Sequence, residues 1–262
     1  MLPALVRDAC RKDDRPYHVI VFEGQGNPAV FAADSHAVIR LGAGGATIKN
    51  LKNAECTTLV LAGSIRRPSM KELRPDWWGV KFFATSGAAA LGDDGLLSAL
   101  IKALESEGFN VIGADELLPE FLMPKGPVGT ALPDETQSAD IALAMKAAKD
   151  LGARDAGQAV VVRHGEVISE EKADGTDAML AHLASLNNSG GILAKAMKPG
   201  QERRADLPAI GPDTMINAHA AGLDGVVIEA GNAFLLDREG TAGMADDKDM
   251  FLIGVDTEGN WQ

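Results

Sequence analysis

Four prolines and two glycines lie within residues 119–133 and interrupt every regular hydrophobic pattern that approaches this stretch. Proline lacks a backbone N–H and clashes inside a helix, so neither a long helix nor a central strand is expected to run through it. The chain has 262 residues, which is enough for two domains of ordinary size. The sequence therefore predicts a first domain over residues 1–123, a linker over 124–136 and a second domain over 137–262.

Short runs of β-branched residues alternate with helical stretches in the first part of the chain. Strands are predicted at residues 18–22, 57–62 and 110–112. An apolar stripe of leucines over residues 96–104 predicts a helix that ends before Gly108. Strands that alternate with helices are typical of parallel α/β sheets. We therefore expect an α/β fold in which the first domain has a Rossmann-like open sheet.

The second part of the chain is also mixed α and β, but its elements alternate less regularly. A helix is predicted over residues 139–151, and residues 160–168 have the pattern of a hairpin with its turn around Gly165. Further strands are predicted at residues 191–194, 225–229, 233–236 and 251–255. We therefore expect a mixed α/β domain to follow the Rossmann-like one.

Charge is distributed unequally between the two halves. Residues 1–126 hold 14 basic and 15 acidic side chains, whereas residues 127–262 hold 11 basic and 22 acidic ones. The formal net charge of −12 argues against nucleic acid as a partner. Two cysteines fit a reducing compartment, and no apolar run reaches the length of a membrane-spanning helix. We therefore expect a cytoplasmic protein.

A basic cluster lies inside the acidic second half. Lys195, Lys198, Arg203 and Arg204 are four of its 11 basic residues and fall within ten positions. Such a cluster favours a negatively charged substrate such as a phosphate or pyrophosphate. Asp206 follows it, and a carboxylate among cations stays ionised and is able to activate water or bind a metal. The alternative interpretation is a salt-bridged surface loop.

Other polar residues stand at the expected ends of strands and helices. Gly63 and Arg67 follow a predicted strand, where α/β sheets collect ligands, although a tight turn with solvated arginines is equally consistent. Asp93 precedes a predicted helix and is suited either to capping it or to holding Mg²⁺. Thr176 and Asp177 are candidates for a helix N-cap or a phosphate site. Zinc, serine-hydrolase and P-loop motifs are absent from the sequence.

Nine short motifs, in the same order along nearly the whole chain, resemble those of the LpxI-type UDP-2,3-diacylglucosamine pyrophosphatases. They are Ala62-Gly63-x-x-x-Arg67-Pro68, Gly92-Asp93-Asp94, Glu107-Gly108-Phe109, Gly113-Ala114-Asp115-Glu116, Gly157-Gln158-Ala159-Val160-Val161, Gly175-Thr176-Asp177-Ala178-Met179-Leu180, Lys198-Pro199-Gly200-Gln201, Asp206-Leu207-Pro208-x-Ile210-Gly211 and Ala221-Gly222-Leu223-x-Gly225.

This resemblance implies an enzyme of lipid A synthesis in Gram-negative bacteria. It would use Mg²⁺ and water to split UDP-2,3-diacylglucosamine into UMP and 2,3-diacylglucosamine 1-phosphate, known as lipid X. Asp206 occupies the family's catalytic position, and the implied Mg²⁺ ligands are Asp206, Asp177 and Asp93. The implied substrate-binding residues are Gly63, Arg67, Gln158, Thr176, Lys195, Lys198, Gln201 and Arg203.

The family likeness also sets expectations for partners. The substrate is a glycolipid nucleotide, contact with the inner-membrane surface would be transient, and a homodimer is left open. Family members begin with a strand and a glycine-rich loop, G-L-I-A-G-x-G-x-L-P, whereas this sequence begins at Leu2-Pro3. We expect the first strand to be missing because the start codon was assigned too late; the alternative is a fragment with impaired activity. The alternative function, favoured by the missing glycine-rich loop, is that of a non-catalytic carrier of an acylated sugar phosphate.

Overall fold

The chain folds as mixed α and β structure, which confirms the predicted fold class in its general form. The computed structural model describes residues 1–66, 69–87, 92–186 and 189–262, with residues 70 and 93 described by their backbone alone. Its contacts divide the chain into two compact units. Unit 1 contains Met1–Leu118 and Glu202–Asp206, and unit 2 contains Pro119–Gln201 and Leu207–Gln262.

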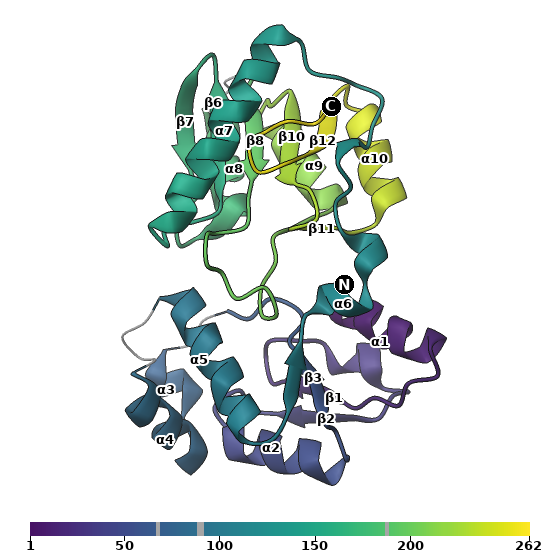
Figure 1. Ribbon diagram of the computed structural model, residues 1–262, viewed down its shortest axis with the longest axis vertical. Coiled ribbons are helices and arrows are strands. Elements are labelled where there is room, and N and C mark those ends of the chain that lie inside the picture. Colours follow the sequence, from purple (N-terminus) through teal and green to yellow (C-terminus); the bar gives the residue numbers. More distant parts are fainter. Residues whose placement is uncertain (67–68, 88–91, 187–188) are drawn as a thin grey trace. The chain divides into compact units, whose positions relative to one another are not determined.

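Unit 1 alternates helices with short parallel strands (Figure 1). Its helices are α1 (Leu2–Lys12), α2 (Gly44–Asn53), α3 (Met70–Leu73), α4 (Trp77–Ser86), α5 (Asp93–Ser106) and α6 (Ala114–Leu117), with a 3₁₀ turn at Pro28–Phe31. Its strands are β1 (Val19–Phe22), β2 (His36–Ile39), β3 (Thr58–Val60) and β4 (Asn110–Ile112). In the described residues β1 pairs only with β2, and β3 only with β4. The continuous Rossmann-like sheet expected for this domain is therefore not observed.

The core of unit 1 is built around α5 and the β3–β4 pair. The predicted leucine stripe forms a helix, and Gly108 follows it with a left-handed φ of 94°, a conformation that glycine adopts readily. Ile101 of α5 is fully buried beside Leu59 and Val111 of the two strands. Ala205, from far along the chain, packs against the same cluster. Unit 1 therefore completes its core with a residue from the second half of the sequence.

Unit 2 contains one six-stranded mixed sheet with the order β5-β12-β10-β8-β6-β7. Its strands are β5 (Gly126–Pro127), β6 (Ala159–Arg163), β7 (Glu166–Glu170), β8 (Ile192–Lys195), β10 (Gly225–Glu229) and β12 (Phe251–Val255). A separate parallel pair joins β9 (Ala209–Ile210) to β11 (Phe234–Leu235). The helices are α7 (Glu135–Ala153), α8 (Gly175–Ser185), α9 (Pro212–Ala220) and α10 (Arg238–Asp246), with a 3₁₀ turn at Pro119–Phe121.

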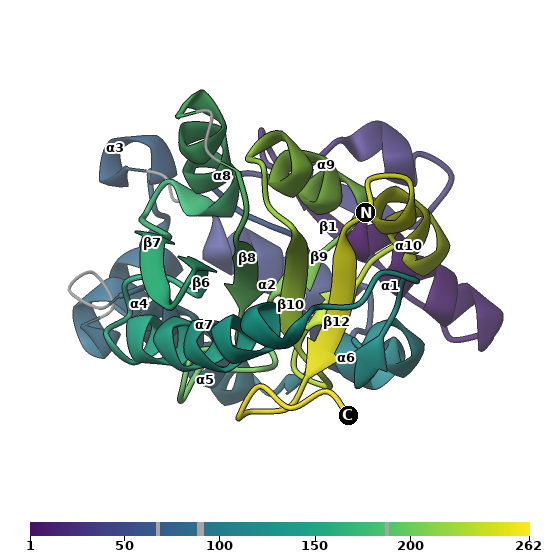
Figure 2. The same cartoon turned by 90° about the horizontal axis from the view of Figure 1, so that it is seen from above.

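The sheet of unit 2 is covered on both faces (Figure 2), with α7 on one side and α8, α9 and α10 on the other. Successive side chains of a strand point to opposite faces, so Val160 packs under α7 while Val161 faces α8 and α9. Strands β8, β10 and β12 are buried along their whole length, as expected for parallel strands between two helical layers. The carboxyl ends of these strands are thus fixed by a continuous core.

Several local signals in unit 2 behave as the sequence indicated. The predicted hairpin forms, and its turn residues His164 and Gly165 have φ values of 52° and 78°, typical of a two-residue hairpin turn. The helix predicted over 139–151 is longer because Asp134 and Gln137 form a capping box at its start. Residues 124–136, expected to form a linker, lie within unit 2, where β5 pairs with β12.

Candidate active site

The segment Glu202–Asp206 carries the predicted catalytic carboxylate and belongs with unit 1. It forms a tight turn in which the N–H groups of Ala205 and Asp206 donate to the Glu202 carbonyl oxygen at 2.9 and 3.2 Å. Ala205 anchors the turn in the unit 1 core, and Asp206 is half-buried. The backbone that presents Asp206 is therefore fixed from both within the segment and beneath it.

Ion pairs fasten this segment to unit 1. Arg203 Nε donates to Asp115 Oδ2 at 2.7 Å, and Arg204 Nη1 donates to Glu105 Oε1 at 2.7 Å. Arg204 Nη2 also contacts Glu202 Oε2 within the segment at 2.8 Å. The hydrogen bonds from Arg204 are the main reason that the pKa of Glu202 lies below its usual range. Both arginines thus hold the Asp206 turn against elements that lie about 90 residues earlier in the sequence.

One carboxylate oxygen of Asp115 is buried without a hydrogen-bond partner among the described residues. Its Oδ2 atom is used by Arg203, whereas Oδ1 is buried and has no hydrogen-bond partner among the described residues. Buried polar atoms are nearly always paired, so an orphaned carboxylate oxygen indicates a place for a water, an ion or a ligand donor. Asp115 is therefore a further candidate site residue, and its place in the Gly113–Glu116 motif was the only sequence signal for it.

In unit 2, the carboxyl end of β8 gathers several of the predicted residues. Lys195 is the last residue of β8, is buried, and pairs in register with Ala159 of β6. Gln158 therefore lies beside Ala196, and the Ala196 N–H donates to the Gln158 carbonyl at 3.0 Å. Lys195 Nζ contacts the Ala209 carbonyl at 3.5 Å. The side-chain oxygen of Gln158 is buried and is the second unpartnered side-chain oxygen in the described regions. This end of the sheet therefore presents a buried side-chain oxygen, that of Gln158, with no hydrogen-bond partner among the described residues.

Glu171 connects Gln158 to Thr176. One oxygen of the buried Glu171 carboxylate accepts from the Gln158 N–H at 2.7 Å, and the other accepts from the Thr176 hydroxyl at 2.7 Å. Neither Thr176 nor Asp177 is the N-cap of α8, as one prediction had it, because the helix begins at Gly175 with Asp174 at the N-cap position and the Thr176 hydroxyl donates to Glu171. Sequence reasoning missed Glu171, and it also missed Glu229, which is buried at the end of β10 and accepts from the Met197 N–H at 3.1 Å.

The motif Lys198–Gln201 forms a turn that closes on itself. Gln201 is buried, and its side-chain oxygen accepts from the Lys198 N–H at 3.0 Å. Gly200 allows the turn with a φ of 79°. Lys198 Nζ pairs with Asp155 at 2.8 Å. Gln201 therefore shapes the backbone that leads into the Asp206 segment, and Lys198 is engaged by an acid of its own unit.

Comparison with known proteins identifies the family of this chain. The model of the LpxI N-terminal domain matches residues 1–121, and that of the LpxI C-terminal domain matches residues 124–253. A protein of Caulobacter vibrioides named UDP-2,3-diacylglucosamine pyrophosphatase LpxI is 36% identical over 266 residues, covering 98% of this chain and 95% of that protein. The chain belongs to the LpxI family. The resemblance inferred from the nine motifs is thereby confirmed.

The LpxI motifs contribute residues to both units. The four clustered cations are divided, since Arg203 and Arg204 belong with unit 1, whereas Lys195 and Lys198 belong with unit 2. Arg203, Arg204 and Lys198 each have an acidic partner, so the salt-bridged alternative describes these side chains. The reason is that Asp115, Glu105 and Asp155, which local sequence does not place nearby, supply the partners.

The predicted metal ligands of this LpxI chain likewise belong to different units. Asp206 belongs with unit 1, whereas the exposed Asp177 lies in α8 of unit 2 and accepts from Asn217 Nδ2 at 3.1 Å. Asp93 begins α5, but its side chain lies outside the described residues, as does all of Arg67. Within the described ranges, no group of three acidic, histidine or cysteine side chains is placed to hold a metal ion. Gly63 follows β3 with a φ of 95° and lies against Pro3.

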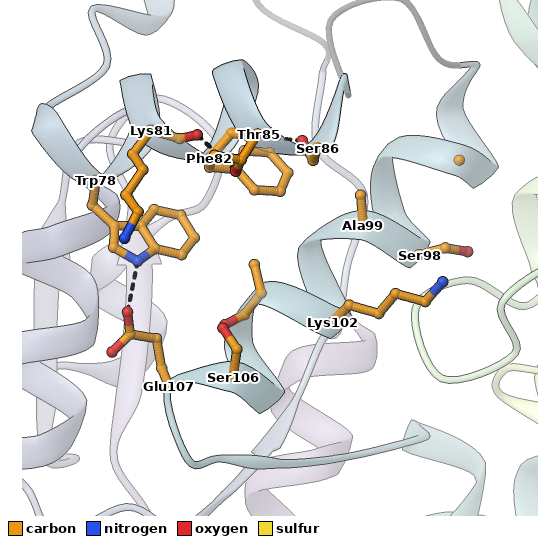
Figure 3. Close-up of a pocket in the computed structure, with 12 residues that line it drawn as sticks. Trp78, Lys81, Phe82, Thr85, Ser86, Ser98, Ala99, Lys102, Ser106 and Glu107 are labelled. Carbon is orange, nitrogen blue, oxygen red and sulfur yellow. Dashed lines mark hydrogen bonds between the residues drawn. The ribbon is translucent and has the colours of Figure 1, made fainter.

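A pocket of about 560 Å³ lies between α4 and α5 of unit 1 (Figure 3). The rings of Trp78 and Phe82 stack in its wall with centroids 5.6 Å apart, and Lys81 and Lys102 also line it. Glu107 accepts from the Trp78 indole at 3.0 Å, and hydrogen bonds from Lys52 and then Trp78 lower its pKa.

No helix in the described part of the chain is long and apolar enough to span a bilayer.

Proposed function

We propose that this chain hydrolyses the pyrophosphate bond of UDP-2,3-diacylglucosamine, releasing UMP and 2,3-diacylglucosamine 1-phosphate, as a step of lipid A synthesis. The observation that carries this proposal is the relationship over nearly the full length of both chains to the Caulobacter protein that bears this activity in its name. No observation favours the alternative of a non-catalytic carrier. We place the reaction in the cytoplasm, at or near the inner-membrane surface where such a lipid substrate resides.

Asp206 is the residue to which we assign the catalytic role. Its carboxylate is able to accept a proton from the attacking water or to orient that water toward phosphorus, as general-base groups do in phosphoryl transfer. Two features support this assignment: Ala205 and the ion pairs of Arg203 and Arg204 fix the turn that carries it. Catalysis by positioning requires such fixed groups, because small displacements of a reacting group are costly.

The remaining predicted residues divide into groups that bind and groups that position. We propose that Lys195 neutralises phosphate oxygens and that the orphaned oxygen of Gln158 accepts a substrate N–H or O–H. Thr176 and Gln201 orient neighbouring backbone through Glu171 and Lys198. Lys198 and Arg203 reach phosphate only by sharing or exchanging their acidic partners. We further propose that Gly63, Arg67 and the parallel strands of unit 1 form a Rossmann-like nucleotide site.

Mg²⁺ fits part of this arrangement. It commonly uses one or two protein carboxylates, with the remaining ligands supplied by water and substrate phosphates. Unit 1 offers Asp206 and the unpartnered oxygen of Asp115, which contacts the same short segment through Arg203. When bound, Mg²⁺ would neutralise charge on the pyrophosphate. We propose Asp206 as its principal protein ligand, with Asp93 and Asp177 as the other candidates.

Removal of divalent cations is expected to lower the rate of UMP release at least about 100-fold, because developing negative charge would lose its neutralising partner. The measurement is UMP formation after dialysis against EDTA, followed by titration with Mg²⁺. Asp93→Asn, Asp115→Asn and Asp177→Asn should be titrated in parallel. The variant that lacks a true ligand will need roughly 10–100-fold more Mg²⁺ for half-maximal rate. Full activity in EDTA would contradict the proposed requirement.

The decisive test of the function is direct. Purified protein is incubated with UDP-2,3-diacylglucosamine in detergent micelles with Mg²⁺, and the products are identified by mass spectrometry. UMP and the 1-phosphate should appear in equal amounts, with oxygen-18 from labelled water in one of the two. Substrate that co-purifies and remains intact would instead indicate a carrier.

A further inference from the structure

Helix α4 has an apolar face that the described residues of the chain leave exposed. Trp77 is 82% exposed and Val80 is 45% exposed, and both lie on the solvent side of the helix. The other exposed positions are Lys81, Ala84 and Thr85, so the face follows the spacing i, i+3, i+4, i+7 and i+8 of one helical surface. A tryptophan this exposed is unusual, because its large ring is normally buried at least in part.

The apolar face of α4 is separate from the hydrophobic core of unit 1. Only Gly79 and Phe82 of α4 are buried, and on the side toward α5 the helix borders the pocket of Figure 3 with Trp78 and Phe82. Helix α4 therefore carries apolar side chains around most of its circumference while burying few of them. A helix with this distribution is expected either inside a large core or at an apolar boundary, and α4 is not inside a core.

Three exposed cations lie on this face or just before it in the sequence. Lys71, Arg74 and Lys81 are exposed on and just before α4. Over residues 69–87 the acids are Glu72, which pairs with Arg66, and Asp76, which caps α4 by accepting from the Gly79 N–H at 3.0 Å. The protein as a whole has a net charge of −12, so this surface is locally basic on an acidic molecule. Such a surface complements a negatively charged partner in one orientation.

We propose that the exposed face of α4, with Trp77 at its N-terminal end and with Lys71, Arg74 and Lys81 on or just before the helix, docks the protein on an anionic lipid bilayer. Tryptophan favours the boundary between headgroups and acyl chains, since its ring is apolar and its N–H is polar. Adjacent lysines and arginines are attracted to anionic lipids. The inference rests on the proposed function only in that a diacylated substrate is held in such a bilayer.

The first test measures sedimentation with vesicles of phosphatidylethanolamine and phosphatidylglycerol. Wild-type protein should bind them, and Trp77→Ser should weaken binding roughly tenfold or more because the interfacial ring is lost. Leu132→Ser is the matched control, since Leu132 is 57% exposed in unit 2 and should not affect binding. Equal binding by wild type and Trp77→Ser, or no binding by wild type, would overturn the proposal.

Charge and depth are tested separately. Lys71→Glu with Lys81→Glu should abolish the preference for anionic over phosphatidylcholine vesicles, whereas Lys146→Glu on α7 should not. The chain has three tryptophans, and brominated lipids should quench the fluorescence of wild type more strongly than that of Trp77→Phe, which retains Trp78 and Trp261. Equal quenching of wild type and Trp77→Phe would place another surface at the membrane and overturn the proposal.

The closing comparison separates this inference from the proposed function. Trp77→Ser should hydrolyse UDP-2,3-diacylglucosamine in detergent micelles at the wild-type rate but lose activity on substrate in vesicles. Vesicle binding without UMP release in micelles would leave the surface standing and reject the function. Activity in micelles without vesicle binding would support the function and reject the docking surface. A Trp77-dependent dimer in solution, without vesicle binding, would identify a second copy as the occupant and overturn the proposal.

Discussion

Replacing Asp206 with asparagine is expected to lower the rate of UMP release about 100- to 10,000-fold, the range associated with loss of a general base. Asparagine preserves the size of the side chain but removes its charge and its capacity to accept a proton. The backbone N–H of Asp206, which donates to the Glu202 carbonyl, is unaffected. The fold should therefore persist, and the measurement is kcat with UDP-2,3-diacylglucosamine in micelles alongside thermal unfolding.

The matched control for this variant is Asp213→Asn. Asp213 is an exposed carboxylate in the first turn of α9 and lies outside the segment that carries Asp206. Its replacement should leave kcat within about twofold of wild type, as for most surface substitutions. If Asp206→Asn keeps more than a tenth of the wild-type rate while folded, another group must perform the step assigned to Asp206.

Replacing Arg204 with alanine is expected to lower kcat about 10- to 100-fold while changing KM little, because the turn that presents Asp206 would lose its attachment to Glu105 and Glu202. Arg204 acts here as a positioning residue. Its side chain is 34% exposed, so the cost in free energy of unfolding should be only about 1 kcal/mol or less. A large loss of rate with a small loss of stability is the signature of displaced geometry.

Three comparisons make the Arg204 result specific. Arg154→Ala removes another exposed arginine pair, with Glu170 at 3.0 Å in unit 2, and should leave kcat unchanged. Arg204→Lys should recover part of the rate, since lysine keeps the charge but not the planar fork. In the Asp206→Asn background, Arg204→Ala should cause no further loss. An additive loss in that background would show that Arg204 acts independently of Asp206.

The hydrogen bonds between Arg204 and Glu202 predict that the stability of the folded protein depends on pH. The pKa of Glu202 is lowered in the folded protein, chiefly by hydrogen bonds from Arg204. Its contribution to stability is therefore present above the unfolded value of about 4.3 and is lost as pH falls through the lower folded pKa. Urea unfolding at several acidic pH values should reveal this loss in wild type and a smaller one in Arg204→Ala.

Local patterns in the sequence were sufficient to predict most of the unit 2 sheet. The hairpin around Gly165 and the strands β10 and β12 depend on alternation, turn chemistry and continuous apolar runs, all of which are local. Strand β2 and helices α9 and α10 were not predicted from local patterns. Helix α4 escaped prediction because its apolar residues do not follow a single buried stripe.

The candidate site depended on information that no local pattern contains. Asp206 was predicted to lie among cations, but the acidic partners of Arg203, Arg204 and Lys198 are Asp115, Glu105 and Asp155, which lie far away in sequence. Likewise, Glu171 connects Gln158 to Thr176 only because β6 and β7 fold back as a hairpin. Buried acids at strand ends are visible as letters in the sequence, but their burial is decided by tertiary structure.

The position of Glu202–Asp206 within unit 1 has a consequence for how the protein is made. Residues 1–118 leave the ribosome about 84 residues before this segment does, which is roughly 4–17 s at ordinary rates of synthesis. Until then, the nascent unit 1 lacks Ala205 in its core and both arginine attachments. The N-terminal unit is therefore unlike an independent domain, since it reaches its final structure only after most of the C-terminal unit has been translated.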